Sequence, residues 1–100
     1  MDIELLPKSI EILGKTIKIK VEPLDDHGHF NLDKKTISLN DELSNHEAME
    51  ALRHECFHAI LAIGGYSFGM KSKEEEALVR LLEHGTEDMF LFKFTKKKKK

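Results

Sequence analysis

The stretch SNHEAMEALRHECFHAILAIGG, residues 44–65, decides the fold because it holds both ends of a helix and its apolar face. Ser44 and Glu47 have the S-x-x-E spacing of a capping box, which predicts a helix that begins near Asn45. The pair Gly64-Gly65 can adopt the left-handed backbone that ends a helix. Between these ends, apolar residues recur at three- and four-residue steps: Met49, Leu52, Cys56, Ala59, Ile60 and Ile63. We therefore expect a helix of about 19 residues with one buried face.

Two histidines and a glutamate stand in the middle of this predicted helix. His54 and His58 are four residues apart, so their side chains lie about 40° apart around the axis and about 6 Å along it. Both imidazoles can therefore reach one metal ion, while Glu55 lies beside them as a base that need not be a ligand. Because the histidines lie nearly opposite the centre of the apolar stripe, we expect the helix to be buried between two layers. The alternative is a pair of histidines that merely make hydrogen bonds in a core.

The first 40 residues read as strands. Alternation of apolar and polar residues over 9–12 and 16–22, with a turn at Gly14-Lys15, predicts a hairpin or one bent strand. Residues 30–32 and 36–40 alternate in the same way on either side of a turn. We expect an α+β domain over residues 1–95, in which a small, mostly antiparallel sheet of three to four strands packs against the motif helix and a C-terminal helix.

Two features of this half could serve a site. The strand at Ile37–Leu39 is expected to be an open edge to which an extended peptide could add. The cluster Asp25-Asp26-His27-Gly28-His29 is expected to be a loop in which any metal binding is adventitious, since it has no matched second half.

A second helix is predicted from about Lys73 to about Phe94. Ser72 and Glu75 have the spacing of a second capping box. Apolar residues and one glycine follow at helical spacing: Leu78, Leu81, Leu82, Gly85, Met89 and Phe92. A catalytic zinc ion commonly has three protein ligands, so the acidic run 74–76 offers the third, although acidic residues also favour a helix start without any metal. Periodicity slightly prefers Glu74 or Glu75 as this ligand.

The motif His54-Glu55-Cys56-Phe57-His58, followed 18 residues later by Glu76 at the opening of a helix, resembles the gluzincin peptidases. Over about residues 9–93 the chain looks like the minigluzincins and the related small phage-type HExxH proteins. The resemblance implies a zinc metallopeptidase, a hydrolase with one zinc ion per chain, a peptide or protein substrate and Glu55 as the general base. It also implies that His54, His58 and Glu76 are the ligands.

The resemblance has two further implications. Arg80 stands where thermolysin-like members have an Asp that orients a ligand His, so this chain departs from the family at the position that supports the histidines. The protease is expected to be latent or self-inhibited, with residues 90–100 over the cleft. A non-catalytic, zinc-stabilised protein-binding module is the alternative, although such a site has no use for Glu55 as a base.

Composition limits the other classes of function. The formal net charge of −2 includes the five lysines of Lys96–Lys100, so the rest of the chain is distinctly acidic and nucleic acid is an unlikely partner. These lysines are expected to form a disordered tail. No apolar run could span a membrane, and no secretory signal is evident. With Cys56 as its single cysteine, the chain is expected to be cytoplasmic and to lack an internal disulfide.

Overall fold

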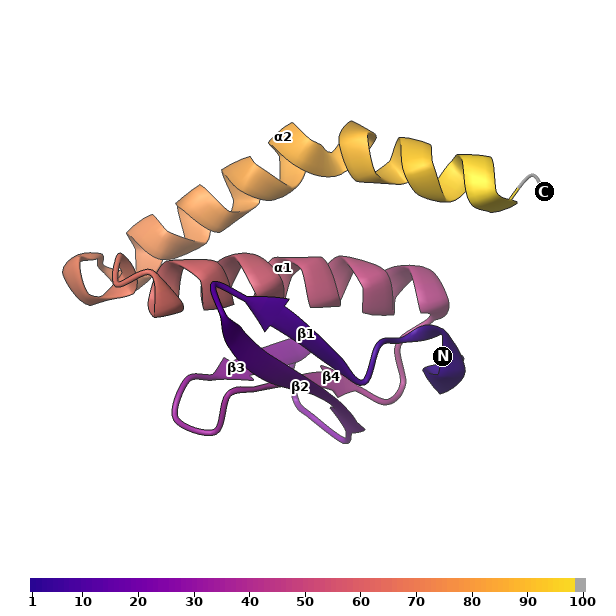
Figure 1. Cartoon of the computed structure of the whole chain (residues 1–100), viewed down its shortest axis with the longest axis horizontal. Helices are drawn as coiled ribbons and strands as arrows, with labels where there is room; N and C mark the ends of the chain where they lie inside the picture. The colour runs from indigo at the N-terminus through magenta and orange to yellow at the C-terminus, as the bar shows by residue number, and fades with distance from the viewer. Residues whose placement is uncertain (99–100) are drawn as a thin grey trace.

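In the computed structural model of the chain, helix α1 lies between a four-stranded sheet and helix α2 (Figure 1). The structure describes the backbone of residues 1–98 and the side chains of residues 1–86. The strands are β1 (Ser9–Ile12), β2 (Lys15–Glu22), β3 (Gly28–Asn31) and β4 (Thr36–Asn40). The helices are α1 (Asn45–Ile63) and α2 (Ser72–Lys98), with short 3-10 helices η1 (Ile3–Leu5) and η2 (Ser67–Gly69) that the sequence did not predict. The predicted α+β fold is confirmed.

The sheet has the strand order β1-β2-β4-β3. The pairs β1–β2 and β3–β4 are antiparallel hairpins, and β2 pairs with β4 in parallel, from Lys18 opposite Thr36 to Glu22 opposite Asn40. The expectation that the strand at Ile37–Leu39 forms an open edge is therefore wrong, because β4 is internal and the edge strands are β1 and β3. Ile37 and Leu39 are fully buried, and an internal position gives these two apolar side chains neighbours on both sides.

The hairpin turns follow local sequence. Leu13 and Gly14 take positive φ values of 49° and 80° between β1 and β2, as a two-residue hairpin turn requires. The second turn spans residues 32–35, and the Lys34 backbone N–H donates to Asn31 Oδ1 at 3.0 Å. The predicted loop at 25–29 is only partly correct, because Gly28 and His29 already belong to β3.

Helix α1 covers the inner face of the sheet. Its start is confirmed, because the Ser44 hydroxyl accepts from the Glu47 N–H at 3.1 Å while the Glu47 carboxylate accepts from the Ser44 N–H at 2.9 Å. Its end is confirmed as well, with Gly65 at a φ of 88°. The core between sheet and helix contains Ile12, Ile17, Ile37, Leu39, Leu43, Ala48, Ala51, Leu52 and Ala59. The helix therefore approaches the sheet through small residues, which permit close packing.

The buried face of α1 is rotated from the predicted stripe. Met49 and Ile60 are 37% and 42% exposed, while Ala48 and Ala51 are buried. The predicted stripe included Met49 and Ile60 and left out Ala48 and Ala51, whereas the close approach of the helix to the sheet favours alanine. His54 and His58 nevertheless face α2, on the side away from the sheet, as expected.

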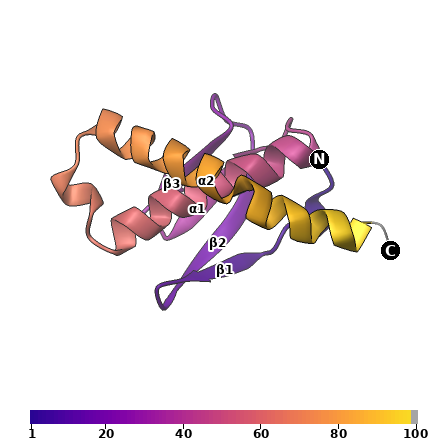
Figure 2. The ribbon, with the colours of Figure 1, turned by 90° about the horizontal axis from the view of Figure 1, so that it is seen from above.

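Helix α2 crosses α1 and extends beyond it (Figure 2). It begins one residue before the predicted start and reaches Lys98, four residues beyond Phe94, since no glycine or proline follows Gly85 to end it. The predicted lysine tail thus starts within the helix, and Lys99 and Lys100 lie outside the described residues. The side chains of residues 90–100, the segment expected over the cleft, also lie outside them.

The first turn of α2 differs from the predicted capping box. The Glu74 carboxylate, rather than that of Glu75, reaches back and accepts from the Lys71 backbone N–H at 2.9 Å. The face toward α1 also differs, because Val79 is fully buried while Leu81 is 67% exposed. Because Glu74 rather than Glu75 makes the contact at the helix start, the Glu75 side chain is free to contact α1.

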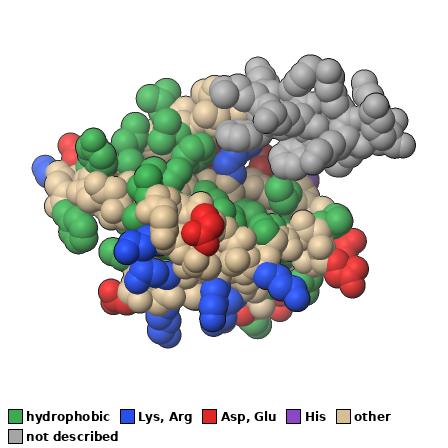
Figure 3. Space-filling view, viewed as in Figure 1, with side chains coloured by type: hydrophobic (Ala, Val, Ile, Leu, Met, Phe, Trp, Pro, Cys, Tyr) green, Lys and Arg blue, Asp and Glu red, His purple; other side chains and the backbone are tan. Residues whose placement is uncertain are grey.

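The face of the molecule drawn in Figure 3 carries side chains of several types. Figure 3 shows lysine and arginine side chains over the sheet and hydrophobic ones near the turn that joins α1 to α2. Tyr66 and Phe68 in that turn are largely exposed. Within the described part of the chain, no helix has both the length and the apolar character needed to cross a membrane.

Candidate metal centre

The two motif histidines present their Nε2 atoms to one point between α1 and α2. The Nε2 atoms of His54 and His58 are 3.2 Å apart, and the two rings meet edge to face. Helix α1 sets this spacing, because residues four apart lie one above the other on the same face.

Glu76 completes a group of three. Its Oε1 atom lies 3.1 Å from the Nε2 atom of His54 and 3.1 Å from that of His58. Ligand atoms around a tetrahedral zinc ion, at about 2.0–2.1 Å from it, are about 3.3 Å from one another, so these three atoms have the spacing that one ion requires. His54, His58 and Glu76 could therefore hold a metal ion. Among residues 1–86, whose side chains are described, they are the only such group, and the cluster at 25–29 forms none.

The outer nitrogen of each histidine contacts a carboxylate on α2. His54 Nδ1 is 2.8 Å from Glu83 Oε1, and His58 Nδ1 is 2.5 Å from Glu75 Oε2. A carboxylate accepts the Nδ1 proton, which leaves the Nε2 lone pair free for a metal ion and holds the ring in place. The support that Arg80 cannot supply thus comes from Glu75 and Glu83.

Sequence reasoning did not single out Glu83. Position 83 lies seven residues after Glu76 and eight after Glu75, which places all three on one side of α2. Acidic residues at this spacing on a helix predicted to face the histidines were the available signal. Glu75 was considered only as a cap or as the third ligand, whereas the structure places it against the Nδ1 atom of His58.

Glu55 lies on the side of α1 that faces β3. It is only 8% exposed, and no hydrogen bond or ion pair to it is formed by the described residues. Burial raises the pKa of Glu55, and the nearby His58 and His54 partly oppose this shift. The edge strand approaches closely here, since a Cβ atom on Gly28 would lie 3.2 Å from Glu55 Cγ. Glu55 is therefore a buried, unpaired carboxylate beside the group of three, as a base rather than a ligand would be.

The acidic surroundings also act on His58. Burial alone would lower the pKa of His58, but the hydrogen bond that it donates to Glu75 and the charges of Glu55 and Glu76 outweigh this effect, so the pKa is raised. Protons therefore compete with a metal ion for this imidazole at acidic pH.

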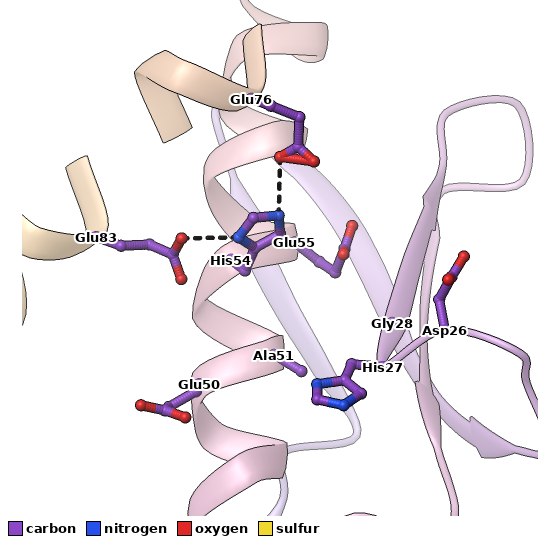
Figure 4. A pocket seen from close by; sticks show the side chains of 9 residues that line it. All are labelled: Asp26, His27, Gly28, Glu50, Ala51, His54, Glu55, Glu76 and Glu83. Carbon is purple, nitrogen blue, oxygen red and sulfur yellow. Dashed lines mark hydrogen bonds and ion pairs between the residues drawn. The ribbon is translucent and has the colours of Figure 1, made fainter. Parts of the chain in front are cut away.

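A pocket of about 510 Å³ opens beside His54 (Figure 4). Its lining comes from the start of β3, from α1 and from α2: Asp26, His27, Gly28, Glu50, Ala51, His54, Glu55, Glu76 and Glu83. A second hollow of about 470 Å³ lies along α2 and is lined by Ser72, Lys73, Glu76, Ala77 and Arg80. Glu76 borders both hollows and His54 borders the first, so two of the three candidate ligands lie at the wall of a space that can admit a substrate.

The chain matches no family model, no curated protein and no solved structure.

Proposed function

We propose that the chain is a zinc-dependent metallopeptidase that hydrolyses peptide bonds. The observation that carries the proposal is the close group of His54 Nε2, His58 Nε2 and Glu76 Oε1, with an unpaired carboxylate, Glu55, beside it. Two imidazoles and one carboxylate are a donor set that suits zinc, and three protein ligands leave a position open for water or substrate.

The side chains would divide the work as follows. His54, His58 and Glu76 would hold the zinc ion. A zinc ion held in this way would lower the pKa of a water molecule bound to it toward neutrality and would polarise the carbonyl group of the peptide bond. Glu55 would take the proton from the attacking water and deliver it to the leaving amine. The raised pKa of Glu55 supports this role, because a base works best when its pKa lies near the working pH.

Substrate backbone would pair with β3, the edge strand of the sheet that borders the pocket. Gly28 belongs to this strand and lines the pocket beside Glu55. An extended peptide could hydrogen-bond to a free strand edge and so bring a scissile bond past the histidines. This assigns to β3 the role that the sequence analysis expected of β4.

Elemental analysis and a peptidase assay test the proposal together. We expect one zinc ion per chain, lost in His58→Ala. Glu55→Gln should retain the zinc ion and lose turnover, while Glu42→Gln, on an exposed loop, should change neither. A zinc-stabilised binding module would also lose metal in His58→Ala, but it would show no turnover for Glu55→Gln to remove. Absence of bound metal in the unaltered chain would refute the proposal.

The proposed latency has its own test. A chain that ends at residue 89 should cleave peptides faster than the full chain if residues 90–100 cover the cleft. Equal rates would show that this segment does not restrain the enzyme.

A further inference from the structure

We propose that the pocket beside the metal-binding group receives a positively charged group of the substrate, an ammonium or a guanidinium. The inference deepens the proposed peptidase function and rests on it for the reaction, but the charge recognition depends on residues outside the metal-binding group. It names the class of peptide that the site would select.

The lining of the pocket is strongly acidic. It carries five carboxylates and no lysine or arginine: Asp26, Glu50, Glu55, Glu76 and Glu83 (Figure 4). A divalent ion would offset two of these negative charges, so the pocket would stay net negative with the ion in place. Such a pocket attracts cations and repels acidic side chains.

Apart from Glu55, two of these carboxylates have no contact with the metal-binding histidines. Asp26 makes no side-chain hydrogen bond or ion pair to the described residues. Glu50 is 3.3 Å from His46, yet its side chain remains 54% exposed. Glu76 and Glu83, in contrast, both contact His54. Asp26 and Glu50 are therefore the residues that can recognise a substrate charge.

The wall that carries Asp26 is held in place. The Asn40 side-chain amide donates to the backbone carbonyl of Leu24 at 2.9 Å and to that of Asp26 at 3.1 Å. The Asn40 backbone N–H also donates to the carbonyl of His27 at 2.9 Å. The loop before β3 is thus tied to β4, so the backbone that carries Asp26 has a defined place at the pocket.

Glu55 gives an independent sign that a donor belongs in this pocket. Its side chain is more than nine-tenths buried, borders the pocket, and receives no hydrogen bond from the described residues. Its carboxylate oxygens remain accessible from the pocket, so a donor of a bound ligand can reach them. A bound peptide would bring backbone N–H donors to this position, while its cationic group would lie near Asp26 and Glu50.

The pocket suits a long basic side chain. Its volume of about 510 Å³ falls within the common range of ligand pockets. An ammonium offers three donors and a guanidinium five, and both carry the charge that the lining favours. The same chemistry could come from a lysine or arginine side chain or from the free amino terminus of a peptide.

Fluorescence anisotropy on zinc-loaded Glu55→Gln protein tests binding without turnover. The probes are dye-labelled pentapeptides that carry lysine, norleucine or glutamate at the central position, each with a free and an acetylated amino terminus. We expect the lysine peptide to bind about tenfold more tightly than the norleucine peptide, and the glutamate peptide to bind most weakly. If the amino terminus is the source of the charge, acetylation rather than norleucine will remove the tight binding.

Two variants test the assignment to Asp26 and Glu50. In the same background, Asp26→Asn combined with Glu50→Gln should reduce the preference to less than about threefold. Asp41→Asn, an exposed loop residue outside the pocket, should leave the preference intact. Equal affinity for charged and neutral peptides, failure of every cationic peptide to bind, or a preference that survives the double variant would overturn the inference.

Cleavage by the unaltered chain separates this inference from the function on which it rests. Cleavage of neutral and basic peptides at equal rates, with equal affinities, would overturn the charge recognition and leave the peptidase standing. A binding preference for cations without cleavage of any peptide would overturn the peptidase and leave the recognition standing.

Discussion

Loss of the Glu83 carboxylate should weaken metal binding although this residue is not expected to touch the ion. Its Oε1 atom lies 2.8 Å from His54 Nδ1, and its side chain is only 20% exposed. Removing a carboxylate that supports a metal-binding histidine typically costs 10- to 100-fold in affinity, or about 1.4–2.8 kcal/mol. Glu83→Gln keeps an acceptor and loses the charge, so we expect about a tenfold loss, with Glu83→Ala toward the upper end.

Competition with a chromophoric zinc chelator measures this effect. The helical content of each variant, followed by circular dichroism, shows whether the fold is retained. Glu75→Gln should act in the same way through His58. Glu42→Gln is the matched control. If zinc affinity stays within twofold of the unaltered chain in both Glu83→Gln and Glu75→Gln, these carboxylates do not support the metal-binding histidines.

Four other predictions follow from the structure. Gly28→Ala places a Cβ atom 3.2 Å from Glu55 Cγ, so kcat should fall by about tenfold or more while zinc affinity stays within twofold, as parallel activity and chelator assays would show. Burial raises the pKa of the Cys56 thiol to about 11, so alkylation at pH 8 should be slow until the chain is unfolded with urea. The pKa of His58 is raised in the folded state, so protonated His58 stabilises the metal-free protein at acidic pH, and this contribution is lost as the pH rises through that pKa. Thermal melts in a chelator at several pH values should show the loss. His58→Gln should remove this pH dependence. Ser44→Ala removes the cap of α1 and should cost about 1 kcal/mol, measured as a lower midpoint in urea.

The features that sequence predicted well are local ones. The ends of α1 depend on Ser44, Glu47 and the two glycines that follow Ile63, all within a few residues of the backbone groups that they serve. The first hairpin likewise depends on the Leu13-Gly14 turn. Such interactions are present in the sequence window itself, so a pattern can identify them.

Strand order and helix rotation depend on more distant partners. The residues of β4 alone do not determine that it pairs with β2 in parallel. This pairing depends on how the two hairpins pack together against α1. The apolar pattern of α2 favoured Leu81, yet Val79 and three glutamates face α1 because histidines there offset the cost of burying carboxylates. Periodicity of apolar residues cannot detect an interface that is partly polar.

The position of α2 has a consequence for the metal-free protein. This helix packs chiefly against α1, and its glutamates at 75, 76 and 83 all reach toward the two histidines. A bound ion would connect the two helices, so part of its binding free energy would stabilise the packing of α2 against α1. Chelation should therefore increase amide hydrogen exchange in α2 before it affects the sheet, and susceptibility to proteolysis would report ion occupancy.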